Sequence, residues 1–369
     1  MSSIKITNVT NHTGDSGSTL SGVSTVTGSN PVRLPVGTTG ERVGIESGSL
    51  RYNSTDNTLE FYNGTSWLTI SSANRDEPFY RGVFGGGATP TVNNTIDYIT
   101  IATTGNATDF GDLTAARSQL AACSSSTRGV FGGGVTPAFS NTIDYITIAS
   151  TGNATDFGDL TLARYSPAAC SSSTRGVFGG GITPTITNTI DYITIASVGN
   201  ATDFGDLTQA RLTLSACSSS TRGVFGGGYA NPSFYNTIDY ITIATTGNAT
   251  DFGDLSTRSD LTACSSSTRG VFGGGFSPTP TPSYSNVLDY ITIATTGNTT
   301  DFGDLTVARY GLAACSSSTR GVFGGGAAAI TNTIDYITIA TTANATDFGD
   351  LTVARFYLAA CSNGHGGLS

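Results

Sequence analysis

A seven-residue motif, Arg-Gly-Val-Phe-Gly-Gly-Gly, occurs six times in the chain and constrains its fold more than any other feature. The copies are 47 residues apart, except for a last interval of 51, and begin at Arg81, Arg128, Arg175, Arg222, Arg269 and Arg320. Each is followed by an Asp-Tyr pair in an apolar run, a segment ending in Phe-Gly-Asp-Leu, an Arg, and an Ala-Cys-Ser run. Repetition at this period is typical of propellers, solenoids and arrays, in which each repeat is one supersecondary unit.

Each repeat divides into four short segments with the composition of β-strands. In the second copy they cover 120–124, 128–131, 142–148 and about 154–160, and Gly- and Ser-rich turns separate them. No copy has ten residues at helical spacing. The third segment does not alternate cleanly between apolar and polar residues, as expected where both faces of a sheet pack against neighbours. The sequence therefore predicts an all-β fold with four strands in each repeat.

The order of these pieces resembles the kelch repeat. One stretch carries Arg164, an Ala-Ala-Cys-Ser run, the Gly-Val-Phe-Gly-Gly-Gly run from Gly176, then Asn188, Tyr192 and Phe204. Phe204 stands where kelch repeats usually have Trp. The resemblance covers residues 80 to about 363 and implies a β-propeller with one four-stranded sheet per blade.

The number of strands predicts how such a ring closes. No good first strand precedes Arg81, whereas the last copy is followed by a surplus first strand at 355–362. We expect this C-terminal strand to pair beside 81–85 and complete the first blade, which removes exposed sheet edges. The predicted fold is a six-bladed kelch-like β-propeller over residues 76–369, closed by the C-terminal strand.

The first 75 residues do not share the repeat. Residues 1–40 contain few large apolar side chains, so we expect an extended segment that serves attachment or oligomerisation. Residues 41–75 are predicted to form a small β module with strands at 49–52, 58–62 and 67–70, joined by Asn-rich turns.

This N-terminal region resembles a module common in bacteriophage tail fibres and other virion appendages. The matching runs are Leu34-Pro-Val-Gly-Thr-Thr-Gly-Glu-Arg, Gly48-Ser-Leu-Arg-Tyr-Asn and Leu59-Glu-Phe-Tyr-Asn-Gly-Thr-Ser-Trp. The six glycine-rich copies also resemble propeller repeats in structural proteins of cyanobacterial viruses. These resemblances imply a virion protein that is assembled in the host cytoplasm and contacts other virion proteins through residues 1–75. Fibre-type attachment further implies a homotrimer.

Charge and composition argue against several classes of function. A net charge of −9 and a pI of about 4.6 disfavour a nucleic-acid partner. No run approaches the ~20 apolar residues of a membrane span, so no membrane insertion is expected. The two histidines, His12 and His365, lie near opposite ends of the chain, which argues against a histidine-centred active site or zinc site. We therefore predict neither an enzyme nor a cofactor-binding protein.

The repeated cysteines and charges are interpreted as structural. Cysteines at equivalent positions of separate sheets lie too far apart for disulfides, so six buried free thiols near the axis are expected. Each repeat carries three Asp, such as Asp97, Asp109 and Asp112, and two Arg, such as Arg81 and Arg117. We expect ion pairs between strands or blades. Calcium at the Asp109/Asp112 turns and a catalytic carboxylate pair stay open alternatives, although six equal copies favour a structural role.

Differences between the copies point to one binding face. They gather in the loop between the second and third strands and in the residues after the Arg that precedes each first strand, and an up-and-down sheet brings both to the same side. Binding loops on a rigid scaffold vary in this way. The candidate binding residues are the aromatic ones there: Tyr229, Phe234, Tyr235, Phe276, Tyr284, Phe139, Tyr165, Tyr310, Phe356 and Tyr357. Drift in tolerant loops is the alternative interpretation.

The sequence thus predicts a virion fibre or appendage protein whose variable face binds a host-surface glycan or protein, or another virion protein. A purely architectural neck, collar or capsid-decoration protein is the alternative. A glycan-cleaving enzyme is disfavoured because no acid pair or histidine stands out from the repeats.

Overall fold

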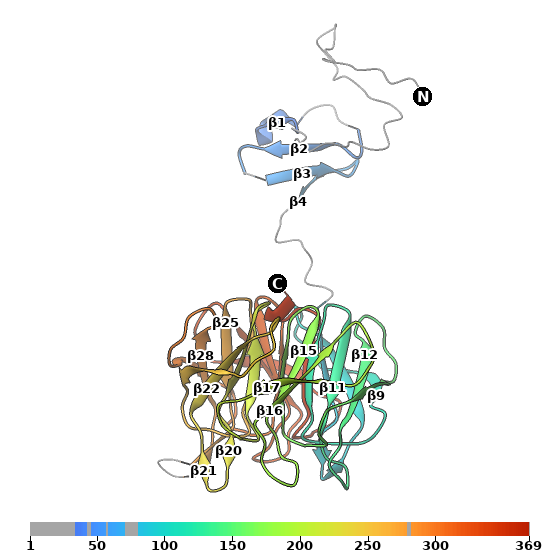
Figure 1. Ribbon diagram of the computed structural model, residues 1–369. Helices are drawn as coiled ribbons and strands as arrows, with labels where there is room; N and C mark the ends of the chain where they lie inside the picture. Colours follow the sequence, from blue (N-terminus) through green and yellow to red (C-terminus); the bar gives the residue numbers. More distant parts are fainter. Residues whose placement is uncertain (1–33, 43–45, 57, 71–79, 279–281, 369) are drawn as a thin grey trace, which may run out of the picture. The chain divides into compact units, whose positions relative to one another are not determined.

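The computed structural model describes residues 34–42, 46–56, 58–70, 80–278 and 282–368. The chain divides into two compact units between Arg75 and Asp76, and both are built from β-strands (Figure 1). The helical elements among the described residues are two short 3₁₀ turns, η1 (Thr39–Glu41) and η3 (Gly366–Leu368). The prediction of an all-β chain is confirmed.

The first unit contains one four-stranded sheet in the order β1-β2-β3-β4. Its strands are β1 (Val36–Gly37), β2 (Leu50–Asn53), β3 (Thr58–Tyr62) and β4 (Trp67–Ile70). The last three confirm the predicted strands. β1, which runs parallel to β2, was not predicted, and the sheet therefore begins before residue 41. Most of the segment predicted to be extended, residues 1–33, lies outside the described residues.

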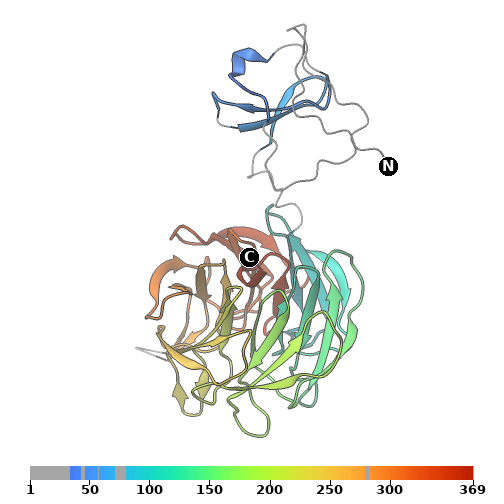
Figure 2. The same cartoon turned by 45° about the horizontal axis from the view of Figure 1, so that its top comes forward.

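The second unit contains six four-stranded antiparallel sheets, numbered here along the chain (Figures 1 and 2). Sheet 1 consists of β34 (Ala359–Ser362), β5 (Arg81–Gly85), β8 (Thr95–Thr100) and β9 (Thr108–Asp112). Sheet 2 consists of β10 (Ala121–Ser124), β11 (Arg128–Gly132), β12 (Thr142–Thr147) and β13 (Thr155–Asp159). Sheet 3 consists of β14 (Ala168–Ser171), β15 (Arg175–Gly179), β16 (Thr189–Thr194) and β17 (Thr202–Asp206).

Sheets 4 to 6 repeat this order. Sheet 4 consists of β18 (Ser215–Ser218), β19 (Arg222–Gly226), β22 (Thr237–Thr242) and β23 (Thr250–Asp254). Sheet 5 consists of β24 (Thr262–Ser265), β25 (Arg269–Gly273), β28 (Val287–Thr292) and β29 (Thr300–Asp304). Sheet 6 consists of β30 (Ala313–Ser316), β31 (Arg320–Gly324), β32 (Thr333–Thr338) and β33 (Thr346–Asp350). Three loops add the hairpins β6 (Ala88–Thr89)–β7 (Thr91–Val92), β20 (Tyr229–Ala230)–β21 (Ser233–Phe234) and β26 (Phe276–Ser277)–β27 (Ser283–Tyr284).

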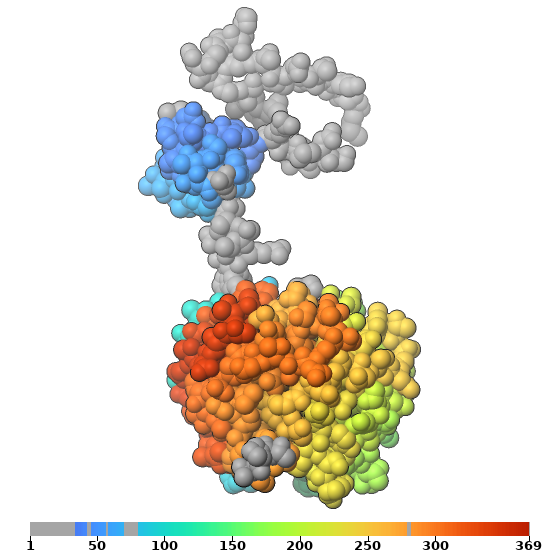
Figure 3. Space-filling model, turned by 90° about the vertical axis from the view of Figure 1, so that its left-hand side faces the viewer, coloured from blue at the N-terminus to red at the C-terminus, as the bar shows by residue number. Residues whose placement is uncertain are grey.

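The C-terminal strand completes sheet 1. β34 pairs antiparallel with β5, and Ala359 lies opposite Gly85 in the register. This confirms the predicted pairing of the C-terminal strand beside residues 81–85. The first strands of the six sheets also contact one another in the cycle β34–β10–β14–β18–β24–β30–β34. Neighbouring sheets therefore follow each other in sequence order around the unit, and the colours of Figure 3 show part of this order on the side that faces the viewer.

The hydrophobic core lies between neighbouring sheets. One cluster joins Val83 and Phe110 of sheet 1 to Phe131 and Ile146 of sheet 2. Because both faces of each sheet are covered in this way, the third strand is apolar on both sides. The glycine that follows each motif Arg permits this close packing. A Cβ atom at Gly82 would lie 2.5 Å from the Sγ of a cysteine in the preceding sheet.

Six buried ion pairs, one in each sheet, tie the connection before the first strand to the third strand. Arg117 Nη2 lies 2.8 Å from Asp144 Oδ2, and both side chains are fully buried. The predicted ion pairs are confirmed, but only one Asp and one Arg of each repeat form them among the described residues. The other Arg instead stacks on a tyrosine, as Arg81 does on Tyr98 with 4.6 Å from Cζ to the ring centroid.

Candidate functional site

The loops that differ between the copies lie together at one end of the second unit. In every sheet a residue after the buried Arg forms an antiparallel bridge with the loop between the second and third strands. The bridges are Ala88–Phe356, Ser118–Val135, Tyr165–Ile182, Leu212–Tyr229, Ser259–Phe276 and Tyr310–Ala327. The prediction that these two connections share a face is confirmed, and we call this end the variable face. In Figure 1 the hairpin β20–β21 marks it, opposite the C-terminus.

Seven aromatic side chains form a continuous series of ring contacts on the variable face. The series begins in sheet 4, where the ring centroids of Tyr229 and Phe234 are 4.7 Å apart. Phe234 lies 5.7 Å from Phe276 of sheet 5, which contacts Tyr284. Tyr284 stacks on Tyr310 of sheet 6 at 5.0 Å and an interplanar angle of 20°. These residues belong to what we call the aromatic band.

The band continues into sheet 1, where Tyr310 contacts both Phe356 and Tyr357. The aromatic band thus consists of Tyr229, Phe234, Phe276, Tyr284, Tyr310, Phe356 and Tyr357 and extends over four sheets. Tyr284 is 44% exposed, whereas the other six are partly buried. Aromatic pairs at these distances attract each other beyond the burial of their surface, so the band is a preformed surface.

The three remaining candidate residues lie outside the aromatic band. Phe139, which is 41% exposed, and Tyr165 form a separate pair 5.1 Å apart. Tyr235 has no ring contact with any residue that the structure describes, and its backbone N–H donates to the Gly228 carbonyl. The structure therefore brings together nine of the ten predicted residues, in two clusters, and leaves Tyr235 apart.

A ring of six residues at the centre of the variable face was missed. Their backbone amides donate to one another's carbonyls at 2.6–3.2 Å in a closed cycle of Gln119, Ser166, Thr213, Asp260, Gly311 and Tyr357. All six have φ between 53° and 62°, the left-handed region that side chains rarely adopt. Strained backbone of this kind is concentrated at functional sites. The six residues line a cavity of about 80 Å³ that opens to solvent.

Asp260 is the acidic member of this ring, and its position holds a different residue in every other copy. Its Oδ2 accepts a hydrogen bond from Ser259 Oγ at 2.7 Å, while Oδ1 is buried without a well-aligned donor. Burial raises the pKa of Asp260, and the nearby hydroxyls of Ser259 and Tyr357 act in the opposite direction. Asp260 is thus a single acid that stands out from the repeats, whereas the expectation from the sequence concerned only acid pairs.

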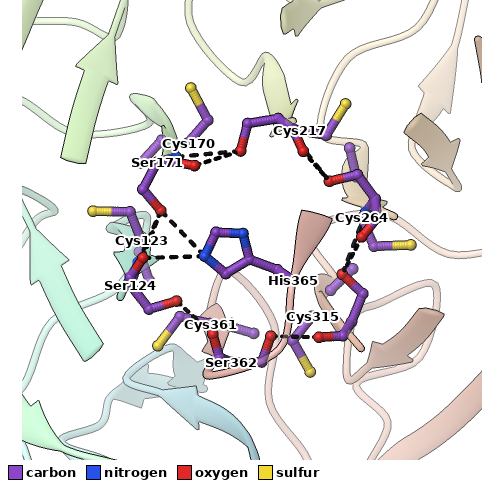
Figure 4. A pocket seen from close by; sticks show the side chains of 18 of the residues that line it. Cys123, Ser124, Cys170, Ser171, Cys217, Cys264, Cys315, Cys361, Ser362 and His365 are labelled. Atoms are coloured by element: carbon purple, nitrogen blue, oxygen red, sulfur yellow. Dashed lines mark hydrogen bonds between the residues drawn. The ribbon is translucent and has the colours of Figure 1, made fainter. Parts of the chain in front are cut away.

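The opposite end of the second unit holds a ring of six serines. Each Oγ donates to the backbone carbonyl of the serine in a neighbouring sheet at 2.6–2.8 Å, in the closed cycle of Ser124, Ser171, Ser218, Ser265, Ser316 and Ser362. We call this the serine ring. Figure 4 shows that it encircles a central cavity and that the adjacent cysteine sulfurs point away from the cavity.

The six cysteines are free and buried, as predicted. Burial raises the pKa of Cys217 and of Cys361 to about 12, so these thiols stay protonated at neutral pH. Among the described residues, no three His, Cys, Asp or Glu side chains lie close enough together to hold a metal ion.

His365 enters the cavity inside the serine ring (Figure 4). The Gly367 amide donates to its Nδ1 at 3.1 Å, so the proton resides on Nε2, which lies 3.1 Å from the Ser124 carbonyl. Burial lowers the pKa of His365 to about 4, and the imidazole is therefore neutral at pH 7. The two histidines were not expected to be catalytic, and this structural role of His365 was not predicted. We call residues 363–368 the C-terminal plug and this end the closed face.

Comparisons with known proteins yield no match to any family model and none to any curated protein. Within the part of the chain that the structure describes, no helix has the length and apolar character needed to cross a membrane.

Proposed function

We propose that the six sheets are the blades of a kelch-like β-propeller and that the chain is a bacteriophage virion appendage protein. Its variable face binds a host-surface glycan or protein, or another virion protein. The six-bladed arrangement is supported by the pairing of β34 with β5 and by the cyclic contacts of the first strands. The virion assignment is supported by the resemblance of residues 34–67 to fibre modules.

The observation that carries the binding function is the coincidence of the aromatic band with the variable loops. The turns at the closed face keep nearly the same Ser-Ser-Ser-Thr sequence in the repeats, whereas the opposite loops differ in length and content. The aromatic band extends over four sheets at the variable end. Aromatic side chains are enriched where proteins bind partners because they bury large areas at low entropic cost.

The proposal gives the N-terminal region the attachment role. Residues 1–75 contact other virion proteins and, by resemblance to fibres, form a homotrimer. The small sheet β1–β4 supports this role because it provides a folded element with a buried polar centre. Glu60 is buried there among the side chains of Arg42, Arg51 and Asn53.

A purely architectural role is the second candidate, favoured by the mutual packing of the aromatic rings. Only Tyr284 and Phe139 among the ten candidate residues exceed 40% exposure. Rings that are already partly covered by each other suit a rigid spacer as well as a binding surface.

Two measurements on intact particles and purified protein separate these candidates. An antibody against residues 76–369 is used to image labelled virions, and the purified chain is tested for binding to bacterial envelope fragments. Label at the far ends of fibres together with envelope binding is the expected result. Label at the neck or capsid without envelope binding would establish the architectural role instead.

A further inference from the structure

Sheet 5 departs from the other five sheets in the two connections that form its variable end. In every other copy the buried Arg comes five residues after the Asp that ends the preceding sheet's last strand, as Arg211 does after Asp206. In sheet 5, Arg258 comes only four residues after Asp254. The same sheet has the longest loop between its second and third strands, 276–285. One connection is shortened and the facing one is lengthened, so space opens between them.

A groove occupies this space. It is lined by Ser256, Thr257 and Arg258 of the short connection and, from the loop and the start of β28, by Ser277, Ser283, Tyr284, Ser285, Asn286 and Val287. Its volume is about 320 Å³, at the lower end of the ~300–1,000 Å³ of small-ligand sites. In Figure 3 the loops of sheets 4 and 5, coloured yellow to orange, form the lower end of the visible surface.

The shortened connection also changes the hydrogen bonds of the buried carboxylate. In sheet 4, Thr208 Oγ1 donates to Asp239 Oδ1 at 2.5 Å, and Thr208 N and Arg211 Nη2 donate to Oδ2. In sheet 5, Ser256 Oγ and Arg258 Nη2 both donate to Asp289 Oδ2 at 2.6 Å.

No residue that the structure describes donates to Asp289 Oδ1. The residue is 6% exposed, whereas its five counterparts are 0% exposed. A carboxylate oxygen with unused acceptor capacity thus lies beside Ser256 and Arg258, which both line the groove.

The charges and polar groups of the groove favour a neutral, hydroxyl-rich ligand. Arg258 is the one charged residue among those that line the groove, and it is balanced by the adjacent Asp289. Serine hydroxyls and the Asn286 amide both donate and accept hydrogen bonds, which matches hydroxyl groups better than an ammonium group, because an ammonium group only donates. Tyr284 supplies an exposed ring on which the C–H face of a sugar can pack.

We propose that this groove binds a neutral saccharide chain, with a sugar hydroxyl donating to Asp289 Oδ1 and a sugar ring packed on Tyr284. The proposal rests on the binding function proposed for the variable face and names its ligand class and position. The other five sheets lack the shortened connection, so the groove gives the face one saccharide site instead of six equivalent ones.

The test uses the full chain on an array of neutral oligosaccharides of glucose, galactose, mannose and N-acetylglucosamine, beside uronic-acid oligosaccharides and basic peptides. Wild type is expected to bind at least one neutral member. Inserting one Ala between Thr257 and Arg258 restores the length found in the other copies and is expected to weaken that binding at least tenfold.

A matched pair of substitutions separates the groove from general loss of stability. Ser256→Ala and Thr208→Ala each remove a hydroxyl bonded to the buried Asp, but only Ser256 lines the groove. Ser256→Ala is expected to weaken saccharide binding about 2- to 10-fold, the loss of one hydrogen bond, and Thr208→Ala to leave it unchanged.

Several outcomes would overturn the proposal. These are binding only of charged ligands, binding of none, or a neutral saccharide held equally well by the Ala-insertion variant. The same variants are tested on envelope fragments together with Phe234→Ala of the aromatic band. If the insertion variant keeps envelope binding while Phe234→Ala loses it, the groove proposal fails and the binding function stands. If wild type itself does not bind envelope, the proposed binding to the host surface fails.

Discussion

The variable face and the closed face are built from the same six repeats, yet they differ in almost every physical property. At the closed face, identical serines donate around a ring, and the neutral imidazole of His365 fills its centre. At the variable face, the corresponding ring consists of backbone hydrogen bonds whose six residues all differ, and one of them, Tyr357, also belongs to the aromatic band. Identical side chains serve closure of the ring, whereas differing side chains are free to serve recognition.

The largest effect is expected from removing the strand that closes the unit. A chain that ends at Leu358 loses β34, which leaves the edge of β5 unpaired and opens the serine ring. We expect this chain to aggregate without a cooperative unfolding transition, as measured by size-exclusion chromatography and circular dichroism. A chain that ends at Asn363 loses only most of the C-terminal plug and should stay folded. A stable monomer ending at Leu358 would contradict the closure by β34.

The next largest effect is expected from breaking a buried ion pair under the variable face. These pairs join the connection before each first strand to the third strand of the same sheet. Asp239→Asn leaves the Arg211 guanidinium buried without its counter-charge and should lower the free energy of unfolding by about 3–5 kcal/mol. Chemical denaturation measures the change. The exposed Asp203 provides the control, since Asp203→Asn should change stability by less than about 0.5 kcal/mol. Equal effects of the two substitutions would argue against burial as the cause.

At the closed face, acid should weaken the C-terminal plug. The pKa of His365 is about 4 in the folded protein and about 6.5 when unfolded, so the unfolded state binds more protons between these values. Stability is therefore independent of this group above pH 6.5 and falls as the pH drops toward 4, by up to about 3 kcal/mol. Denaturation from pH 7 to 4 measures the free energy of unfolding of wild type and of His365→Gln. The difference between the two isolates the contribution of His365 from that of the carboxylates. A pH-independent difference would contradict the buried neutral imidazole.

A single hydrogen bond of the serine ring should give the smallest effect. Ser218→Ala removes the donor to the Ser171 carbonyl, which lies 2.8 Å away, and should cost about 1 kcal/mol in the free energy of unfolding. Ser197, in an exposed turn, serves as the control, and Ser197→Ala should be nearly neutral. If both substitutions were neutral, the serine ring would not contribute to closure.

Much of this architecture is predictable from the sequence because the repeats carry it. The four strands, the pairing of the last strand with the first, and the shared face of the two variable connections all follow from the order of apolar runs and turns. The buried free cysteines follow from their equivalent positions in separate sheets. These features depend on local pattern and on counting, which a single sequence contains.

The features that were missed depend on contacts between distant residues or lie outside the repeats. His365 belongs to the non-repeated tail, and its partner Ser124 is 241 residues away. The serine that follows each cysteine is the same in all six copies, which is a signal for the serine ring. Which neighbouring carbonyl each hydroxyl reaches depends on the spacing between sheets, which the sequence does not contain. The variable position held by Asp260 was a usable signal, since an acid occurs there only once. Nothing in the loop sequences distinguishes Tyr235 from the tyrosines that join the aromatic band.

One binding experiment that compares the two faces tests most directly whether the variable face is the binding surface. One variant carries Phe234→Ala, Phe276→Ala and Tyr310→Ala in the aromatic band, and the other carries Ser126→Arg, Ser173→Arg and Ser220→Arg in exposed turns of the closed face. Each purified full chain is titrated against bacterial envelope fragments. We expect the aromatic variant to lose binding and the closed-face variant to bind like wild type. Retained binding by the aromatic variant, or loss only in the closed-face variant, would contradict this expectation.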